Sequence, residues 1–191
     1  MRCIPVNWCE KVVFYSKVPS LPVARDTLVN QALQSNCDYI FFLDSDMIFE
    51  DPQDPNDALN MLYQCMNKDK SNKDAKIVSA LYRAKQKQGF NYAMWVRANE
   101  KGFGPIQKWT GNWIEVDVAG LGCSLIDLDV FRNTPKPWFY WELQNGISED
   151  FYFFELAKKH GYNTHIFSDV KLSHLGGLKV KCDGSIVTPD M

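Results

Sequence analysis

The sequence contains no long hydrophobic run and no strong excess of one charge. Its longest apolar stretches, such as 39–43, are far shorter than the roughly 18 residues that a membrane-spanning helix needs. Lys and Arg number 21 against 23 Asp and Glu, which leaves a net charge of -2. This charge is too small to attract nucleic acid or an anionic membrane over the whole surface. We therefore expect no transmembrane segment and no nucleic-acid partner, and a local site must bind any anionic ligand.

Closely spaced cysteine pairs are also lacking. The six cysteines form no CxxC motif: they are Cys3, Cys9, Cys37, Cys65, Cys123 and Cys182. This spacing predicts free thiols rather than a zinc knuckle or a disulfide framework. The first 13 residues have no apolar block that could serve as a signal peptide, so we expect a cytoplasmic protein.

What is present is the composition of an ordinary globular domain. The chain has 191 residues, of which 46% are hydrophobic and 23% charged. Disordered, collagen-like and coiled-coil chains differ strongly from these values. The length predicts one domain over 1–191.

Strand and helix patterns alternate in the first half. Short apolar or β-branched runs predict strands at 11–15, 38–43 and 76–82. Between them, one helix is predicted from Ser20 to about Asn36 and another from Asp54 and Asp57 onward. This alternation is typical of an α/β sheet with parallel strand pairs. The second half predicts sheet segments at 90–96, 112–118 and 123–128, a helix over 148–160, two short strands at 164–167 and 170–173, and a hairpin turn at Asp183-Gly184.

The strongest chemical signal is Asp44-Ser45-Asp46, which follows the apolar strand 38–43 directly. Open α/β sheets bind ligands beyond the carboxyl ends of their strands. Alternate residues of an extended chain point the same way, so both carboxylates can approach one divalent cation. The alternative is a solvated acidic loop. Two acids at the end of so apolar a strand are costly unless they bind a ligand, so we favour the metal site.

Two further candidates lie in the second half. Glu149-Asp150 opens the helix predicted over 148–160, where a carboxylate could act as a general base toward an acceptor hydroxyl. Acids there also complement the helix dipole without any catalytic role, and spacing alone leaves both interpretations open. His174 follows a short strand and could complete a metal shell, although an ordinary strand-end histidine is the alternative.

Together these residues resemble a known family. The segments 25–33, 38–47 and 119–126, followed by Ser148-Glu149-Asp150 and Ser173-His174, are similar in order and spacing to the GT-A fold glycosyltransferases of the family 2 type. The resemblance covers about 18–177. It implies a Rossmann-like mixed sheet flanked by helices. Members of this family normally begin with a strand, a helix and a second strand that build the nucleobase pocket, whereas 24 residues precede Arg25 here, so a shortened N-terminus is expected.

The resemblance also implies residue roles. Asp46 would bind Mn²⁺ or Mg²⁺ directly, Asp44 would contact the metal or the ribose, and His174 would be a further metal ligand. Asp150, with Glu149 beside it, would supply the base of an inverting transfer.

Two arginines are candidates for binding the diphosphate of the donor. Arg83 follows the strand 76–82 at a position that resembles the family's strand end, with Lys85 as the alternative. Arg25 could serve the nucleotide or pair with an acid. Four tryptophans near the glycine-rich turn and the acidic pair offer flat faces for a sugar ring, or simply pack in the core: Trp109, Trp113, Trp138 and Trp141.

The expected function is transfer of a sugar from a nucleotide-diphosphate sugar, such as a UDP- or GDP-sugar, to a hydroxyl of a glycan, lipid or protein acceptor. Two alternatives stay open. One is a phosphatase of the haloacid dehalogenase type, whose nucleophile also lies in an Asp-x-Asp motif after an apolar strand. The other is a sugar- or nucleotide-binding domain without catalysis.

Overall fold

The centre of the molecule is a mixed sheet. We analysed a computed structural model that describes residues 14, 16–17, 19–50, 55–68, 75–84, 91–100, 102–142, 144, 146–175, 179–180 and 186–187. Several predicted features lie outside these residues: all of the strand 11–15 except Phe14, three cysteines (Cys3, Cys9 and Cys182), Asp54, Lys85 and the turn at Asp183-Gly184.

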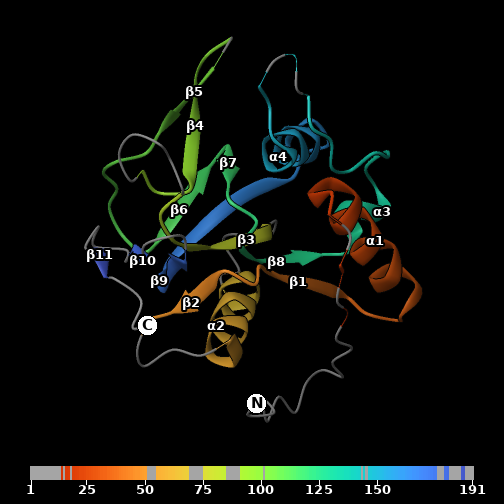
Figure 1. Ribbon diagram of the computed structural model, residues 1–191, viewed down its shortest axis with the longest axis horizontal. Helices are drawn as coiled ribbons and strands as arrows, with labels where there is room; N and C mark the ends of the chain where they lie inside the picture. The colour runs from red at the N-terminus through yellow and green to blue at the C-terminus, as the bar shows by residue number, and fades with distance from the viewer. Residues whose placement is uncertain are drawn as a thin grey trace.

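The main sheet has eight strands and a smaller sheet has three (Figure 1). The main path runs β1 (Tyr39–Leu43), β8 (Cys123–Asp127), β3 (Ala75–Leu81), β9 (Asn163–Leu175), β10 (Lys179–Val180) and β11 (Ile186–Val187), while β2 (Met47–Phe49) and β6 (Trp113–Val116) also pair with β9. The smaller sheet has the order β5 (Gly102–Pro105), β4 (Met94–Asn99), β7 (Val118–Ala119).

Strand directions explain how the sheet gathers its functional residues. β3 pairs in parallel with β9, whereas β8 lies antiparallel between β1 and β3. The parallel pairing expected between the strands at 38–43 and 76–82 is wrong, because β8 separates β1 from β3. The parallel pair that forms joins β3 to β9 of the second half. Because β8 is antiparallel to both, β1 and β3 still point the same way, and their carboxyl ends share one edge with the start of β8.

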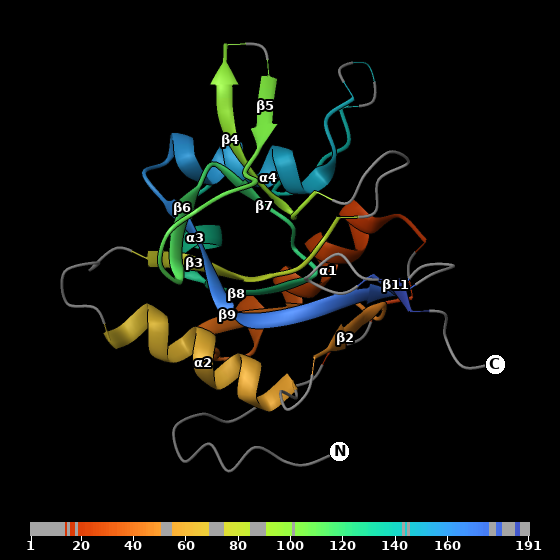
Figure 2. The same ribbon diagram turned by 90° about the vertical axis from the view of Figure 1, so that its left-hand side faces the viewer.

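Helices cover both faces of the main sheet. α1 (Leu21–Gln34), α3 (Asp129–Arg132) and α4 (Glu149–Lys159) contribute to one buried apolar cluster, and α2 (Pro55–Lys68) contributes to a second. Figure 2 shows α2 on the opposite side of the sheet from α4. The predicted mixed α/β architecture with flanking helices is confirmed. Among the described helices, none has the length and apolarity to cross a bilayer.

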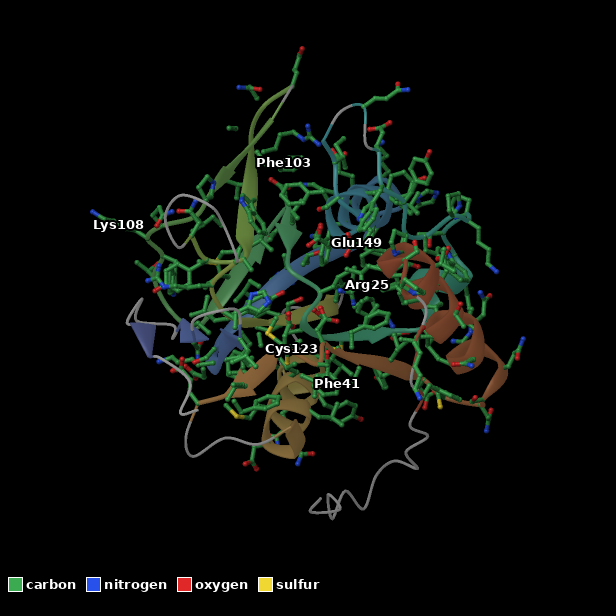
Figure 3. The ribbon with its side chains drawn as sticks, viewed as in Figure 1. Arg25, Phe41, Phe103, Lys108, Cys123 and Glu149 are labelled. Atoms are coloured by element: carbon green, nitrogen blue, oxygen red, sulfur yellow. The ribbon has the colours of Figure 1, made fainter. Side chains whose placement is uncertain are left out.

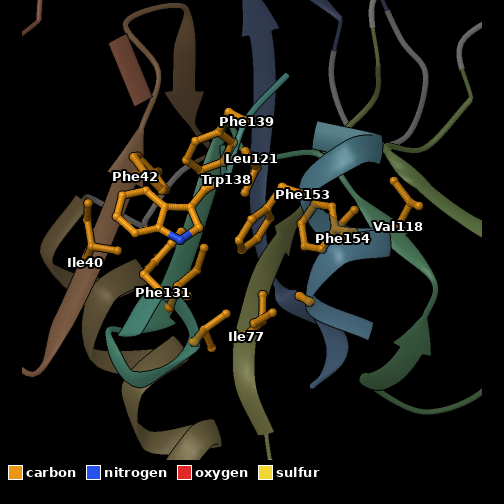
Figure 4. Packing of buried hydrophobic residues seen from close by; sticks show 14 of the residues in the cluster. Ile40, Phe42, Ile77, Val118, Leu121, Phe131, Trp138, Phe139, Phe153 and Phe154 are labelled. Carbon is orange, nitrogen blue, oxygen red and sulfur yellow. The ribbon is translucent and has the colours of Figure 1, made fainter. Parts of the chain in front are cut away.

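Aromatic packing fixes the start of α4. Phe153 and Phe154 are fully buried, and the Phe153 ring stacks on Phe131 at 5.3 Å and on Phe139 at 5.1 Å between centroids (Figure 4). Burying a phenylalanine side chain contributes roughly 1.5–3 kcal/mol. These contacts hold the first turn of α4, and with it Glu149 and Asp150, against the sheet.

The predicted break between strands 164–167 and 170–173 is wrong, since β9 is one continuous strand of 13 residues. It contains an irregularity instead: Ala80 pairs with Phe167, but the next residue of β3, Leu81, pairs with Lys171. Ser168 and Asp169, at this bulge, form hydrogen bonds with Asn112 in the loop before β6. The Ser168 N–H donates to the Asn112 carbonyl at 2.9 Å, and the Asn112 amide donates to Asp169 at 2.8 Å.

The other predicted elements agree with the structure to within a few residues. The segment 90–96 corresponds to β4, which begins only at Met94, and 112–118 is divided between β6 and β7. Three elements besides the terminal strands were not predicted. β2 spans three residues, β5 contains two glycines, and α3 spans four residues, so none of them has a periodicity that a sequence pattern could reveal.

Candidate functional site

The candidate site lies where β1 and β3 end and β8 begins. Asp44 follows β1, and its N–H donates to the Gly122 carbonyl at 2.9 Å, just before β8. Tyr82 follows β3, and its hydroxyl accepts from the Gly122 N–H at 2.9 Å. Three segments far apart in sequence therefore meet through the turn Gly120-Leu121-Gly122.

The two glycines of this turn allow a close approach of backbone to the Tyr82 ring. A Cβ added at Gly120 would lie 2.0 Å from the Tyr82 Oη, and one at Gly122 would lie 2.2 Å from the Met47 Cε. A side chain at Gly120 would displace the buried Tyr82, whereas one at Gly122 would displace the flexible end of the half-buried Met47. The glycines indicate a close approach in the sequence, but the sequence does not identify Tyr82 as the residue that they contact.

Arg25 links the first aspartate to the acidic pair. Its Nη2 donates to the Asp44 Oδ2 at 3.0 Å, and its Nε lies 3.5 Å from the Glu149 Oε1. Its side chain is 5% exposed and that of Glu149 is 7% exposed, and the guanidinium lies over the Phe42 ring. Figure 3 shows Arg25 and Glu149 facing each other from α1 and α4. Of the two roles considered for Arg25, the geometry favours pairing with acids.

Asp46 is placed differently, beside His174. The His174 Nε2 lies 3.3 Å from the Asp46 Oδ2, because β2 and β9 pair here with Met47 opposite His174. The other ring nitrogen, Nδ1, donates to the Arg83 carbonyl at 3.2 Å, since a carbonyl oxygen can only accept. In the neutral imidazole, Nε2 therefore presents a lone pair to a carboxylate. A cation or a proton between the two atoms removes this conflict.

This pair fits one part of a divalent metal site. A carboxylate oxygen and an imidazole nitrogen are both ligands of Mn²⁺-like ions, and the Arg83 carbonyl fixes the ring in the tautomer that ligation needs. Among the residues that the structure describes, no three His, Cys, Asp or Glu side chains gather into one metal-binding group. Of the three predicted ligands, Asp46 and His174 lie together, while Asp44 is turned to Arg25.

The two acids at the start of α4 have separate partners. Glu149 is buried and accepts from the Trp141 Nε1 at 2.6 Å in addition to its contact with Arg25. Asp150 accepts from the Ser148 hydroxyl and from the Phe151 N–H, both on Oδ1. Burial raises the pKa of Asp150, and the neighbouring charge of Glu149 raises it further. Glu149 thus holds Arg25, and Asp150 is the better placed of the two to exchange a proton.

Arg83 lies at the edge of the site and contacts Tyr92. Its guanidinium lies over the Tyr92 ring at 4.2 Å and donates to the Tyr92 hydroxyl at 3.1 Å. Its clearest link to the site is the backbone carbonyl that orients His174.

Two groups in the site escaped the sequence analysis as functional candidates. Tyr82 contacts the His174 ring edge-on at 5.7 Å, and burial raises the pKa of its hydroxyl well above the usual value, with Asp44 and Asp150 adding to the shift. Burial likewise raises the pKa of the Cys123 thiol, which keeps it protonated. Both residues are buried, and both lie near enough to Asp44 for its charge to raise their pKa values further.

The four tryptophans have different environments. Trp138 is buried in the core, Trp113 stacks on His165, and Trp109 packs against Tyr92. Trp141 is exposed at the surface while its indole N–H reaches Glu149. Of the four, only Trp141 has a direct bond to a residue of the site.

Comparison with known proteins bears on the fold alone. No protein-family model matches the sequence, and no curated protein sequence matches it. Among solved structures, the chain is similar to A197 from STIV, with a TM-score of 0.67 and 22% identity over 94% of this chain and 81% of that one. The name of that protein states no activity. At this identity the likeness shows that the two chains share a fold.

Proposed function

We propose that this chain is a GT-A fold glycosyltransferase that moves a sugar from a nucleotide-diphosphate sugar to an acceptor hydroxyl. The observation that carries the proposal is the contact between Asp46 and His174. The His174 ring packs against Tyr82, and Asp150 on α4 lies near enough to Tyr82 for its charge to act on the Tyr82 hydroxyl. These contacts support a metal-ligand pair and a candidate base within one site.

Charge at the site supports a cationic ligand. Three carboxylates are grouped around Arg25: Asp44, Glu149 and, through its charge, Asp150. Asp46 adds a fourth, next to His174. Among the described residues, Arg25 is the cation that contacts Asp44 and Glu149, and a divalent cation beside Asp46 would add positive charge to this group of acids. A Mn²⁺ or Mg²⁺ ion held by Asp46 and His174 would offset the charge of the departing diphosphate.

In this scheme, Arg25 and Asp44 have a positioning role. Because Arg25 binds both Asp44 and Glu149, it fixes the end of β1 relative to the start of α4. The loop that carries Asp46 and the helix that carries Asp150 are then held in a constant relation. A near-attack geometry depends on such fixed relations between the donor and the acceptor sides.

Asp150 is the proposed general base. It takes the proton of the acceptor hydroxyl as that oxygen bonds to the anomeric carbon, while the bond from this carbon to the diphosphate breaks. The pKa of Asp150 is raised above that of an ordinary aspartate. A higher pKa makes the carboxylate a stronger base, which suits a group that must accept a proton. One displacement of this kind inverts the anomeric centre.

Titration calorimetry with UDP and GDP, with and without Mn²⁺, tests the donor half of the proposal. We expect Mn²⁺-dependent nucleotide binding that Asp46→Asn weakens by about 100-fold or more, because the substitution removes a hard anionic ligand at constant volume. Asp129→Asn is the matched control, since Asp129 is an exposed aspartate paired with Arg132 on α3. Release of UDP from UDP-sugars in the presence of an acceptor then reports turnover.

Three results would count against the proposal. Equal Mn²⁺-dependent affinity in the parent and Asp46→Asn would remove the metal assignment. Thermal stabilisation by fluoroberyllate but not by nucleotides would favour the phosphatase. Nucleotide-sugar binding without any UDP release would favour a binding domain.

A further inference from the structure

A cavity of about 600 Å³ lies between the β4–β5 hairpin and the start of α4. This volume is within the usual range of small-molecule sites. Figure 3 shows Phe103 projecting from the hairpin toward α4, on the side where Glu149 lies. The cavity adjoins the candidate site and is formed by residues that the metal-ligand pair does not use.

Aromatic rings form one part of the cavity lining. Trp95 and Phe103 come from the hairpin, and Phe151 comes from the first turn of α4. The Phe151 ring centroid lies 4.9 Å from that of Trp95 and 5.2 Å from that of Phe103. The three rings thus support one another and form a rigid apolar surface with few rotatable bonds.

Charged, planar side chains form another part. Arg97 pairs with Glu155, and its guanidinium lies over the Phe103 ring at 4.5 Å. Glu100, at the tip of the hairpin, also lines the cavity. Guanidinium and carboxylate groups in fixed orientations can donate to and accept from neighbouring hydroxyls.

Two residues that line the cavity also contact the proposed base. Ser148 and Phe151 line it, and these same residues donate to the Asp150 Oδ1 through a hydroxyl and a backbone N–H. A molecule in the cavity would therefore contact the two residues that donate hydrogen bonds to the Asp150 carboxylate.

We propose that this cavity binds the acceptor and that the acceptor is a carbohydrate. This inference rests on the proposed function and names the substrate of its acceptor side. A sugar ring presents apolar C–H faces to aromatic rings and hydroxyls to charged planar groups, and the cavity supplies both on adjoining walls. A lipid chain would cover Glu100 and the exposed parts of the Arg97–Glu155 pair without offering them hydrogen bonds, at a cost in desolvation.

Saturation-transfer NMR on the whole chain tests this assignment without requiring turnover. The probes are methyl glycosides of glucose, galactose, mannose and N-acetylglucosamine together with cellobiose, lactose and chitobiose, and 1-octanol and a serine-containing hexapeptide represent the other acceptor classes. We expect saccharide binding that Phe103→Ala and Phe103→Leu both weaken by about tenfold. Phe103→Leu keeps an apolar side chain on the hairpin but removes the ring. A loss of affinity in this variant therefore measures the contribution of the aromatic face to saccharide binding. Tyr63→Ala is the control, since Tyr63 is a partly buried aromatic on α2 that packs against Tyr39.

The results separate this inference from the proposed function. No saccharide binding, saccharide binding indifferent to both Phe103 substitutions, or binding of octanol or the peptide alone would overturn the assignment, even where UDP binds with Mn²⁺ as proposed. Saccharide binding that depends on Phe103, found together with no Mn²⁺-dependent nucleotide binding, would leave the carbohydrate site standing and remove the glycosyltransferase.

Discussion

The two aspartates of Asp44-Ser45-Asp46 lie two residues apart and have opposite surroundings. Asp44 is paired with Arg25, a buried cation that belongs to the protein. Asp46 is 38% exposed and faces the Nε2 atom of a histidine whose other nitrogen is already used as a donor. The first aspartate has its positive charge built in, whereas the second lies where an external cation can bind.

The two carboxylates of one motif therefore have different roles in the proposed function. Their spacing in sequence suggests two equal metal ligands, but Asp44 is paired with Arg25 in the structural framework, and Asp46 lies beside His174 at the proposed metal site. The acidic pair on α4 divides in the same way, because Glu149 is held by Arg25 and Trp141 while Asp150 adjoins the cavity. Arg25 joins the two structural members, and in the proposed function Asp46 and Asp150 are the two that would contact the metal and the acceptor.

Removing Arg25 is expected to have the largest effect on this arrangement. Arg25→Met leaves the buried Glu149 and the partly exposed Asp44 without their shared cation. The loss costs up to about 3–5 kcal/mol in the free energy of unfolding, the scale for breaking a buried ion pair. Urea denaturation measures the loss. Arg132→Met is the control, because the exposed pair of Arg132 with Asp129 contributes only about 0–1 kcal/mol. Equal, small losses in both variants would show that the Arg25 cluster is not part of the framework.

Asp150→Asn is expected to separate chemistry from binding. Turnover should fall by about 100-fold or more, the scale for deletion of a general base, while Mn²⁺-dependent UDP affinity stays at the parent value. Parent turnover should also decline as pH falls through the raised pKa of Asp150, because the protonated carboxyl cannot accept a proton. Near-parent turnover in this variant would reduce Asp150 to a helix-start acid.

The same substitution has a stability consequence with a definite sign. A carboxyl whose pKa is raised in the folded state stabilises the fold at low pH, and this contribution is lost as pH rises through the folded-state pKa. Asp150→Asn should therefore gain melting temperature relative to the parent as pH rises. Asp26→Asn is the matched control, since burial also raises the pKa of Asp26. It should show the same trend in stability with unchanged turnover, and a turnover loss there would show that the effect is not specific to Asp150.

Asp44→Asn is expected to have the smallest effect, and it tests the difference between Asp44 and Asp46 directly. Arg25 already balances the charge of Asp44 and keeps its contact with Glu149 in the variant. Calorimetry should show UDP affinity with Mn²⁺ weakened by tenfold at most, about 1.4 kcal/mol, against about 100-fold for Asp46→Asn. The reverse order would place the cation at Asp44 and invert the roles of the two aspartates.

Local patterns in the sequence predicted much of the fold. α1, α2 and α4, and the strands β1, β3 and β8, follow from periodicity and end signals. The insertion of β8 between β1 and β3 was not predictable, because it joins segments about 80 residues apart along the chain and no local pattern records such a pairing.

The site was predictable in its chemistry more than in its contacts. Residue types and order brought out Asp46, His174 and Asp150, which the fold gathers at or beside one edge. The partner of Arg25 stayed undecided because pairing depends on how α1 packs against the sheet. The aromatic part of the cavity was missed because Trp95, Phe103 and Phe151 come from three segments and resemble core residues individually.

The bulge in β9 makes the site sensitive to chain length as well as to residue identity. Successive side chains of a strand alternate between the two faces of a sheet. The residues between Phe167 and Lys171 therefore set which face His174 occupies, although they lie outside the site. Deleting or inserting a single residue there would reverse that parity and turn the imidazole away from Asp46, whereas most exchanges of side chain at the same positions would leave it in place. In the proposed site, the length of this segment therefore matters independently of the amino acids that occupy it.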